Sequence, residues 1–134
     1  MTKVGAVLGV IVAVLALLLV VAGFALYRPD IPYERLEAKY ARPTSKFAEL
    51  PGGVRMHYRD DGDPGKLVVM LVHGYGDSFL SWEPWIQHLS PDFRVITIDL
   101  PGHGLTRAPE DYRSSPDSYA DLVDALAAKL GLPP

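Results

Sequence analysis

Cysteine is absent from this chain of 134 residues, and its absence excludes several kinds of site at once. Without thiols there are no disulfide bonds, no thiolate nucleophile and no cysteine-based zinc centre. The four histidines give little support to a metal site of another kind. We therefore expect no bound metal.

An excess of positive charge is also missing, since 13 Lys and Arg residues stand against 16 Asp and Glu residues. Beyond residue 27 the basic residues form no run or cluster. Proteins that bind nucleic acids carry a basic patch or stripe. We expect no nucleic-acid partner.

Charged side chains are missing altogether from the segment between Val4 and Leu26. As a helix rising about 1.5 Å per residue, this run reaches about 34 Å, enough to cross a hydrocarbon core of about 30 Å. A cleavable signal peptide is the alternative, and Gly23–Ala25 fits its cleavage site. Its apolar region normally spans only about 7–15 residues, however. We favour an uncleaved, single-pass anchor that contacts the membrane through residues 4–26.

The charges beside this anchor do not fix its orientation. Lys3 precedes it, whereas Arg28, Arg35, Lys39 and Arg42 come after it. The positive-inside rule would keep the C-terminal domain in the cytoplasm. A short N-terminal tail instead usually stays inside and exports the rest, so we lean towards an exported or periplasmic domain.

The remaining sequence predicts a linker and one α/β domain. The boundaries expected are 1–27 for the anchor, 28–45 for a linker with a short helix over 33–40, and 46–134 for the domain. Segments 46–50 and 54–59 flank a Pro-Gly-Gly turn and predict a hairpin. The all-apolar run 67–72 predicts a strand buried on both faces, and 94–98 predicts a second. A short helix capped by Ser81 should lie between them, with Trp82 and Trp85 in the core.

The last segment is predicted to be a helix. Ser115 is a suitable N-cap and Pro116 suits the first helical position. Apolar residues recur at helical spacing, and Gly131 and Pro133 end the pattern. The order is hairpin, then strand–helix–strand–helix, which is typical of an α/β fold with a mostly parallel sheet.

Glycine-rich loops come after both apolar strands, namely His73–Ser78 and Asp99–Gly104. Glycine lets the chain turn sharply and bring an N–H close to a ligand. Ligand sites of parallel sheets lie outside the carboxyl ends of the strands. We expect both loops to face the same side.

These two loops at this spacing, with Ser81-Trp82 between them, resemble the α/β-hydrolase superfamily over about Phe47–Leu132. The similarity is greatest to the branch of epoxide hydrolases, haloalkane dehalogenases, C–C bond hydrolases and esterases. It implies an enzyme that acts on a small-molecule substrate without a cofactor. Haloalkane dehalogenases usually carry Asn or Gln where Tyr75 stands, which argues against dehalogenation.

The resemblance also assigns roles to the two loops. The backbone N–H of Tyr75 would be one oxyanion-hole donor, and His73 would hold the loop rather than act as the base. His57 and His88 are expected at the surface or in packing. The residues expected to shape the loops are His73, Gly74, Gly76, Asp99, Gly102, His103 and Gly104.

The nucleophile of this family sits in a G-x-S-x-G turn, and no serine of the chain stands in that pattern. In the family the nucleophile strand comes after a helix with an ending like Leu130-Gly131-Leu132. We therefore expect the nucleophile, acid and base to lie beyond residue 134, so that the chain alone is inactive. The alternative is a truncated, non-catalytic, membrane-tethered protein with an α/β-hydrolase-like domain.

Overall fold

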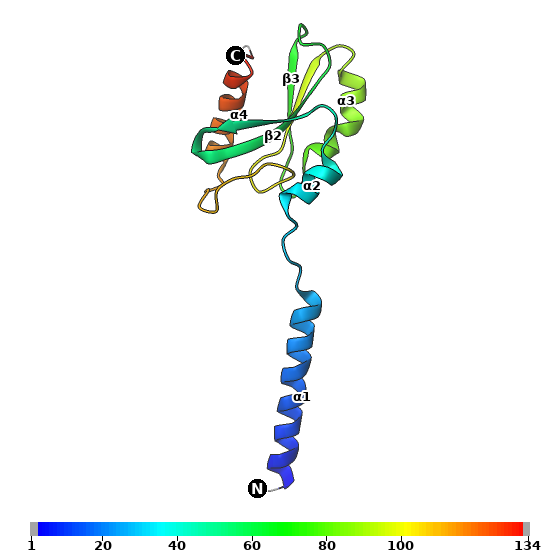
Figure 1. The fold of residues 1–134 in the computed structure, drawn as a ribbon, viewed down its shortest axis with the longest axis vertical. Helices are drawn as coiled ribbons and strands as arrows, with labels where there is room; N and C mark the ends of the chain where they lie inside the picture. Colours follow the sequence, from blue (N-terminus) through cyan, green and yellow to red (C-terminus); the bar gives the residue numbers. More distant parts are fainter. Residues whose placement is uncertain (1–2, 133–134) are drawn as a thin grey trace. The chain divides into compact units, whose positions relative to one another are not determined.

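The computed structural model describes residues 3–132 and divides the chain into two compact units, with the boundary between Pro32 and Tyr33. Met1, Thr2, Pro133 and Pro134, which lie at the ends of the predicted anchor and domain, are outside the described residues. Each unit has its own architecture, and Figure 1 shows the elements of both.

The first unit consists of helix α1, Lys3–Leu26, followed by an extended segment. All of its described side chains are exposed within the unit, because nothing packs around the helix. By length and composition α1 suits a membrane span, and a signal sequence passes the same test.

The second unit is built on a sheet of four strands, in the order β1-β2-β4-β3. Their bounds are Ser45–Leu50 for β1, Val54–Asp61 for β2, Val68–Val72 for β3 and Arg94–Ile98 for β4. The predicted hairpin is confirmed, with a short 3₁₀ turn, Pro51–Gly53, between β1 and β2. Strand β2 continues antiparallel to β4, and β4 is parallel to β3.

Helix α4, Pro116–Lys129, covers one face of the sheet and begins as predicted. The Ser115 hydroxyl accepts a hydrogen bond from the Ser118 N–H. In return, the Ser118 hydroxyl accepts a hydrogen bond from the Ser115 N–H. These two bonds satisfy two N–H groups that the start of the helix would otherwise leave unpaired. Its residues Leu122 and Leu126 are buried against alternate residues of the strands, among them Met56 and Ile96.

Helix α3, Glu83–Leu89, differs from the prediction in its start and in one side chain. A 3₁₀ turn, Phe79–Trp82, precedes it and is capped by the Ser78 hydroxyl, not by Ser81. Pro84 falls in the first turn, where the missing N–H costs no hydrogen bond. Trp85, expected in the core, is 58% exposed, because only the Ile86 face of this short helix turns inward. Figure 1 shows α3 and α4 flanking the strands.

Strand β3 is also less enclosed than predicted. Leu67 lies outside the strand and is 72% exposed, and Val72 is 41% exposed. Within residues 3–132, β3 is paired only with β4, so that its second edge is open there. The apolar run predicts a strand buried on both faces, but the residues of β3 are only half-buried and Val72 is exposed.

The predicted linker 28–45 is divided between the two units. Helix α2 spans Tyr33–Tyr40, where a short helix was expected, and it belongs to the same compact unit as the sheet. By compactness, the second unit begins at Tyr33.

Candidate active site

The two glycine-rich loops lie next to each other because β3 and β4 run parallel and end in register. Val72 stands opposite Ile98 in the ladder, so His73 and Asp99 come after the two strands at the same edge of the sheet. This juxtaposition is the one expected from the sequence. It is also where parallel sheets hold their ligands.

Two histidines tie these loops together in opposite directions. The Leu100 N–H donates to Nε2 of His73 at 3.0 Å, and the Gly76 N–H donates to Nε2 of His103 at 3.2 Å. Each ring thus accepts a backbone N–H of the other loop. Because Nε2 is the acceptor in both rings, each Nδ1 carries the proton. We call this pair of contacts the histidine cross-brace.

Each ring of the cross-brace is also fixed by its own loop. Nδ1 of His73 lies 2.8 Å from the Gly74 carbonyl oxygen, and Nδ1 of His103 lies 3.2 Å from the Pro101 carbonyl oxygen. The two ring centroids are 5.0 Å apart. The geometry agrees with a loop-holding role for both histidines, and Gly102 completes the turn that presents His103.

Asp99 is the buried centre of the second loop, with a fully inaccessible carboxylate. One oxygen accepts the Phe79 N–H at 2.8 Å, and the other accepts the Leu105 N–H at 2.9 Å. The backbone at Gly104 has φ +51°, and a Cβ atom there would stand only 2.1 Å from the carboxylate. Glycine is therefore required at position 104 by both conformation and space.

The Tyr75 N–H has no acceptor within residues 3–132, and neither has the N–H of Gly74 before it. The next N–H along the chain, that of Gly76, is held by His103, and Gly76 has φ +72°, a conformation that favours glycine. The Tyr75 side chain is fully exposed and touches the loops only through an edge-on contact with His103. At this position the backbone N–H lies in the loop, whereas the phenol extends into solvent.

His57, expected at the surface or in packing, is fully buried. The sheet is covered on both faces, so that alternating polarity along β2 does not separate inside from outside. Nδ1 of His57 lies 2.8 Å from Asp99 Oδ2, and Nε2 lies 2.8 Å from the Ser45 hydroxyl. Sequence spacing gives no signal for this contact, because Asp99 is distant along the chain.

The hydrogen bonds from serine to histidine to aspartate resemble those of a catalytic triad, here Ser45, His57 and Asp99. The surroundings of these residues nevertheless favour a structural role. A general base must reach the leaving group of the substrate, and His57 has no accessible surface. The Ser45 hydroxyl also accepts the Arg42 N–H at 2.9 Å. We interpret this chain of hydrogen bonds as a tie between β1, β2 and the Asp99 loop.

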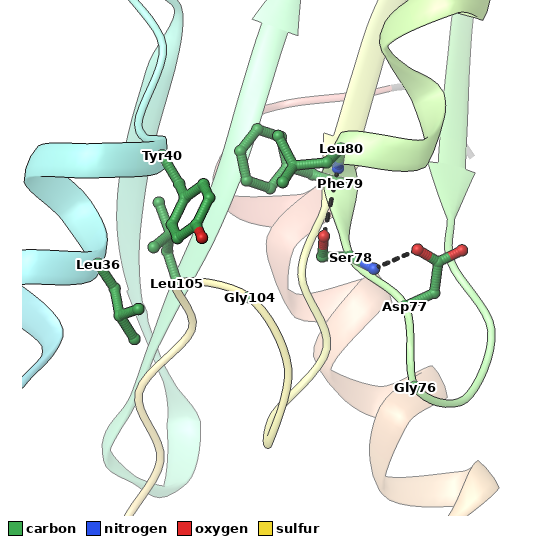
Figure 2. A pocket seen from close by; sticks show the side chains of 9 residues that line it. All are labelled: Leu36, Tyr40, Gly76, Asp77, Ser78, Phe79, Leu80, Gly104 and Leu105. Atoms are coloured by element: carbon green, nitrogen blue, oxygen red, sulfur yellow. Dashed lines mark hydrogen bonds between the residues drawn. The ribbon is translucent and has the colours of Figure 1, made fainter. Parts of the chain in front are cut away.

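A cleft of about 310 Å³ lies between helix α2 and the two loops. Figure 2 shows Leu36 and Tyr40 projecting from α2, and the segment from Gly76 to Leu80 across from them. Gly104 and Leu105 complete the lining. The Ser81 hydroxyl and the Ser78 N–H lower the pKa of Asp77, so the rim carries a carboxylate at neutral pH.

Helix α2 is fixed to the domain by an arginine pair from distant parts of the chain. Glu37 accepts hydrogen bonds from Arg55 at 2.8 Å and from Arg107 at 2.6 Å. Burial alone would raise the pKa of Glu37, but the hydrogen bonds from Arg107 and Arg55 outweigh it and the pKa is lowered. The Tyr33 hydroxyl also donates to the Thr106 carbonyl oxygen at 3.2 Å.

Replacing Glu37 by glutamine is expected to loosen α2 at neutral pH. Because the folded pKa is lowered, the carboxylate stabilises the docked helix above the ordinary value of 4.5 and loses this effect as the pH falls through the folded pKa. We expect Glu37→Gln to reduce the free energy of opening of α2 by about 1–2 kcal/mol at pH 7. Hydrogen-exchange protection of the α2 amides measures this quantity.

The control for this change is Glu34→Gln on the same helix. Glu34 contacts Arg107 at 3.2 Å but is 74% exposed, and exposed ion pairs contribute at most about 1 kcal/mol. Equal effects of the two substitutions at pH 7, or an effect of Glu37→Gln that grows in acid, would contradict the assignment of Glu37 as the anchor.

Comparison with known proteins places the chain in a family. Residues 68–134, half of the sequence, match the family described as having the alpha/beta hydrolase fold. The chain therefore belongs to the α/β-hydrolase fold family, as the resemblance implied. The strand order and the paired loops described above are the part of that fold which this chain contains.

Individual relatives agree with this assignment. An uncharacterized hydrolase of Saccharomyces cerevisiae is 33% identical over 84 residues, which are 63% of this chain and 29% of the yeast protein. A solved epoxide hydrolase from metagenomes of hot environments is 30% identical with a TM-score of 0.61, over 65% of this chain and 30% of that one. A bacterial membrane phospholipase A shares the fold, with 24% identity and a TM-score of 0.64 over 90% of this chain and 40% of that one.

The chain thus spans less than half the length of each of these proteins. The proteins that it resembles are hydrolases. The roles of the individual loop residues are not addressed by these comparisons.

Proposed function

We propose that this chain is the N-terminal part of a membrane-anchored hydrolase that acts on a small ester-like substrate. Its nucleophile, acid and base, a Ser–His–Asp/Glu set, would lie beyond residue 134. The observation that carries the proposal is the free Tyr75 N–H at the edge where β3 and β4 end. The cross-brace supports it, because it holds the next residue, Gly76.

The chemistry depends on the effect of a free backbone donor at such an edge. Attack of a serine on an ester carbonyl moves negative charge onto the carbonyl oxygen. An N–H aimed at that oxygen binds more strongly as the charge grows, and therefore stabilises the transition state more than the bound substrate. Water then hydrolyses the covalent acyl intermediate. In this proposal Tyr75 supplies one donor and the residue after the nucleophile supplies the second.

The proposed anchor is helix α1. Its apolar side chains from Val4 to Leu26 are exposed within their unit. In a bilayer, the helix would pair its backbone N–H and C=O groups internally and its apolar side chains would contact lipid. We propose a single-pass anchor through residues 4–26.

A second candidate function is a non-catalytic, membrane-tethered protein. Two observations favour it. The sequence holds no G-x-S-x-G turn. Ser45, which bonds to the His57 ring of the His57–Asp99 pair, contacts a ring that is fully buried. In both proposals residues 1–134 alone hydrolyse nothing.

The test compares the complete gene product with residues 1–134. We expect the complete product to hydrolyse p-nitrophenyl acetate or butyrate and to react with a fluorophosphonate probe, and Ser45→Ala to keep both properties. Residues 1–134 should do neither. Turnover by residues 1–134 would overturn the proposed division of the catalytic residues, and a complete product without either property would favour the non-catalytic alternative.

A further inference from the structure

The cleft between α2 and the loops is lined by a residue that is next to the proposed oxyanion donor in the chain. Gly76, which lines the cleft, comes directly after Tyr75 in the chain. A substrate whose carbonyl oxygen met the Tyr75 N–H would therefore have part of the cleft within reach. Its volume of about 310 Å³ lies at the lower end of the roughly 300–1,000 Å³ typical of ligand pockets.

The lining of the cleft is apolar along its walls and polar at one end. Leu36 and the ring of Tyr40 face it from α2, and Leu80 and Leu105 face it from the loops. Asp77 carries the only carboxylate among the lining residues, and the Ser81 hydroxyl and the Ser78 N–H both donate to its Oδ1. None of the described residues that line the cleft is cationic, so an anionic group would find no partner among them. An uncharged hydrocarbon chain matches this surface.

The α2 wall is held in place rather than free. Glu37, between Leu36 and Tyr40 in the sequence, makes ion pairs with Arg55 and Arg107, and both arginines lie in the domain. Two residues after α2, Arg42 pairs with Glu83 at 2.6 Å. A wall fixed at its middle and just beyond its C-terminal end keeps its shape when a ligand enters, which lowers the entropy lost on binding.

Resting on the proposed hydrolase function, we propose that this cleft binds the hydrocarbon part of the substrate. Leu36 and Tyr40 of α2 are then specificity-determining residues, and they set the length of acyl chain that the enzyme accepts. The substrate class is an uncharged ester with one medium-length hydrocarbon chain.

The experiment measures kcat/KM of the complete gene product for p-nitrophenyl acetate, butyrate and octanoate. Leu36→Trp fills the cleft, and we expect the octanoate-to-acetate ratio of kcat/KM to fall about tenfold or more. Tyr40→Ala widens the cleft and is expected to raise the same ratio. Because both ratios compare two substrates on one variant, partial loss of folded protein does not alter them.

Ala38→Trp is the matched control, since Ala38 is exposed on the same helix and does not line the cleft. It should leave the ratio unchanged. The same ratio in Leu36→Trp, Tyr40→Ala and Ala38→Trp would overturn this inference while leaving the hydrolase proposal intact. If the parent protein hydrolyses none of the three esters, the hydrolase proposal fails and this inference fails with it.

Discussion

Proline in place of Tyr75 is expected to lower kcat of the complete enzyme by about 10²–10³, the usual effect of losing one oxyanion-hole donor. Proline has no N–H, so this change removes a donor at the strand tips that has no acceptor within residues 3–132. KM should change little, because the lost hydrogen bond is strongest in the transition state. Steady-state kinetics with p-nitrophenyl acetate gives both constants.

Tyr75→Phe is the matched control for this prediction. The phenol ring is fully exposed, and its hydroxyl makes no hydrogen bond within the described residues. We therefore expect kcat within about twofold of the parent, since the substitution removes no contact that is made only in the transition state. Equal damage from phenylalanine and proline would refute the backbone assignment. A loss of the parental circular-dichroism melting transition in Tyr75→Pro would instead indicate a misplaced loop, contrary to the exposed position of this residue.

Alanine in place of Asp99 is expected to cost about 3–5 kcal/mol of folding stability. The carboxylate is the acceptor for the N–H groups of Phe79 and Leu105 and the partner of the His57 ring. Removing it leaves these buried donors without a partner, at about 1–3 kcal/mol each before the surroundings relax. Urea unfolding of the complete protein, followed by circular dichroism, measures the loss.

The control for Asp99 is Asp92→Ala, a change of the same kind at an exposed position in the preceding turn. It should alter the free energy of unfolding by less than about 0.5 kcal/mol. A double-mutant cycle with Gly104→Ala adds a second test. The added methyl group would meet the Asp99 carboxylate, so Gly104→Ala should be less damaging once Asp99 is already alanine. Additive effects would show that the close contact does not determine the requirement for glycine.

Local sequence patterns are sufficient to predict most elements of the domain. They predict the hairpin, the parallel pair β3 and β4 and the capped helix α4, because alternation, apolar runs and capping residues act over a few positions. The adjacency of the two glycine-rich loops depends on the parallel pair alone. The family resemblance and the fold class are confirmed by the comparisons.

Contacts between distant segments are not predictable in this way. The burial of His57 depends on Asp99 and Phe79, both of which reach it only after folding. The docking of α2 depends on Arg55 and Arg107, which have no pattern that relates them to Glu37 in the sequence. Exposure of Trp85 arises because a helix of seven residues has room for few inward positions.

Because of the histidine cross-brace, the two loops have to be transferred together when they are grafted onto another protein. Grafting residues 73–78 onto another sheet without residues 99–106 would leave Gly76 unheld and His73 without the Leu100 N–H. A recombination point placed between the two strands would divide the pair in the same manner. Chimeras that keep both segments from one parent should retain the loop geometry, and those that mix parents should need matching histidines on both sides.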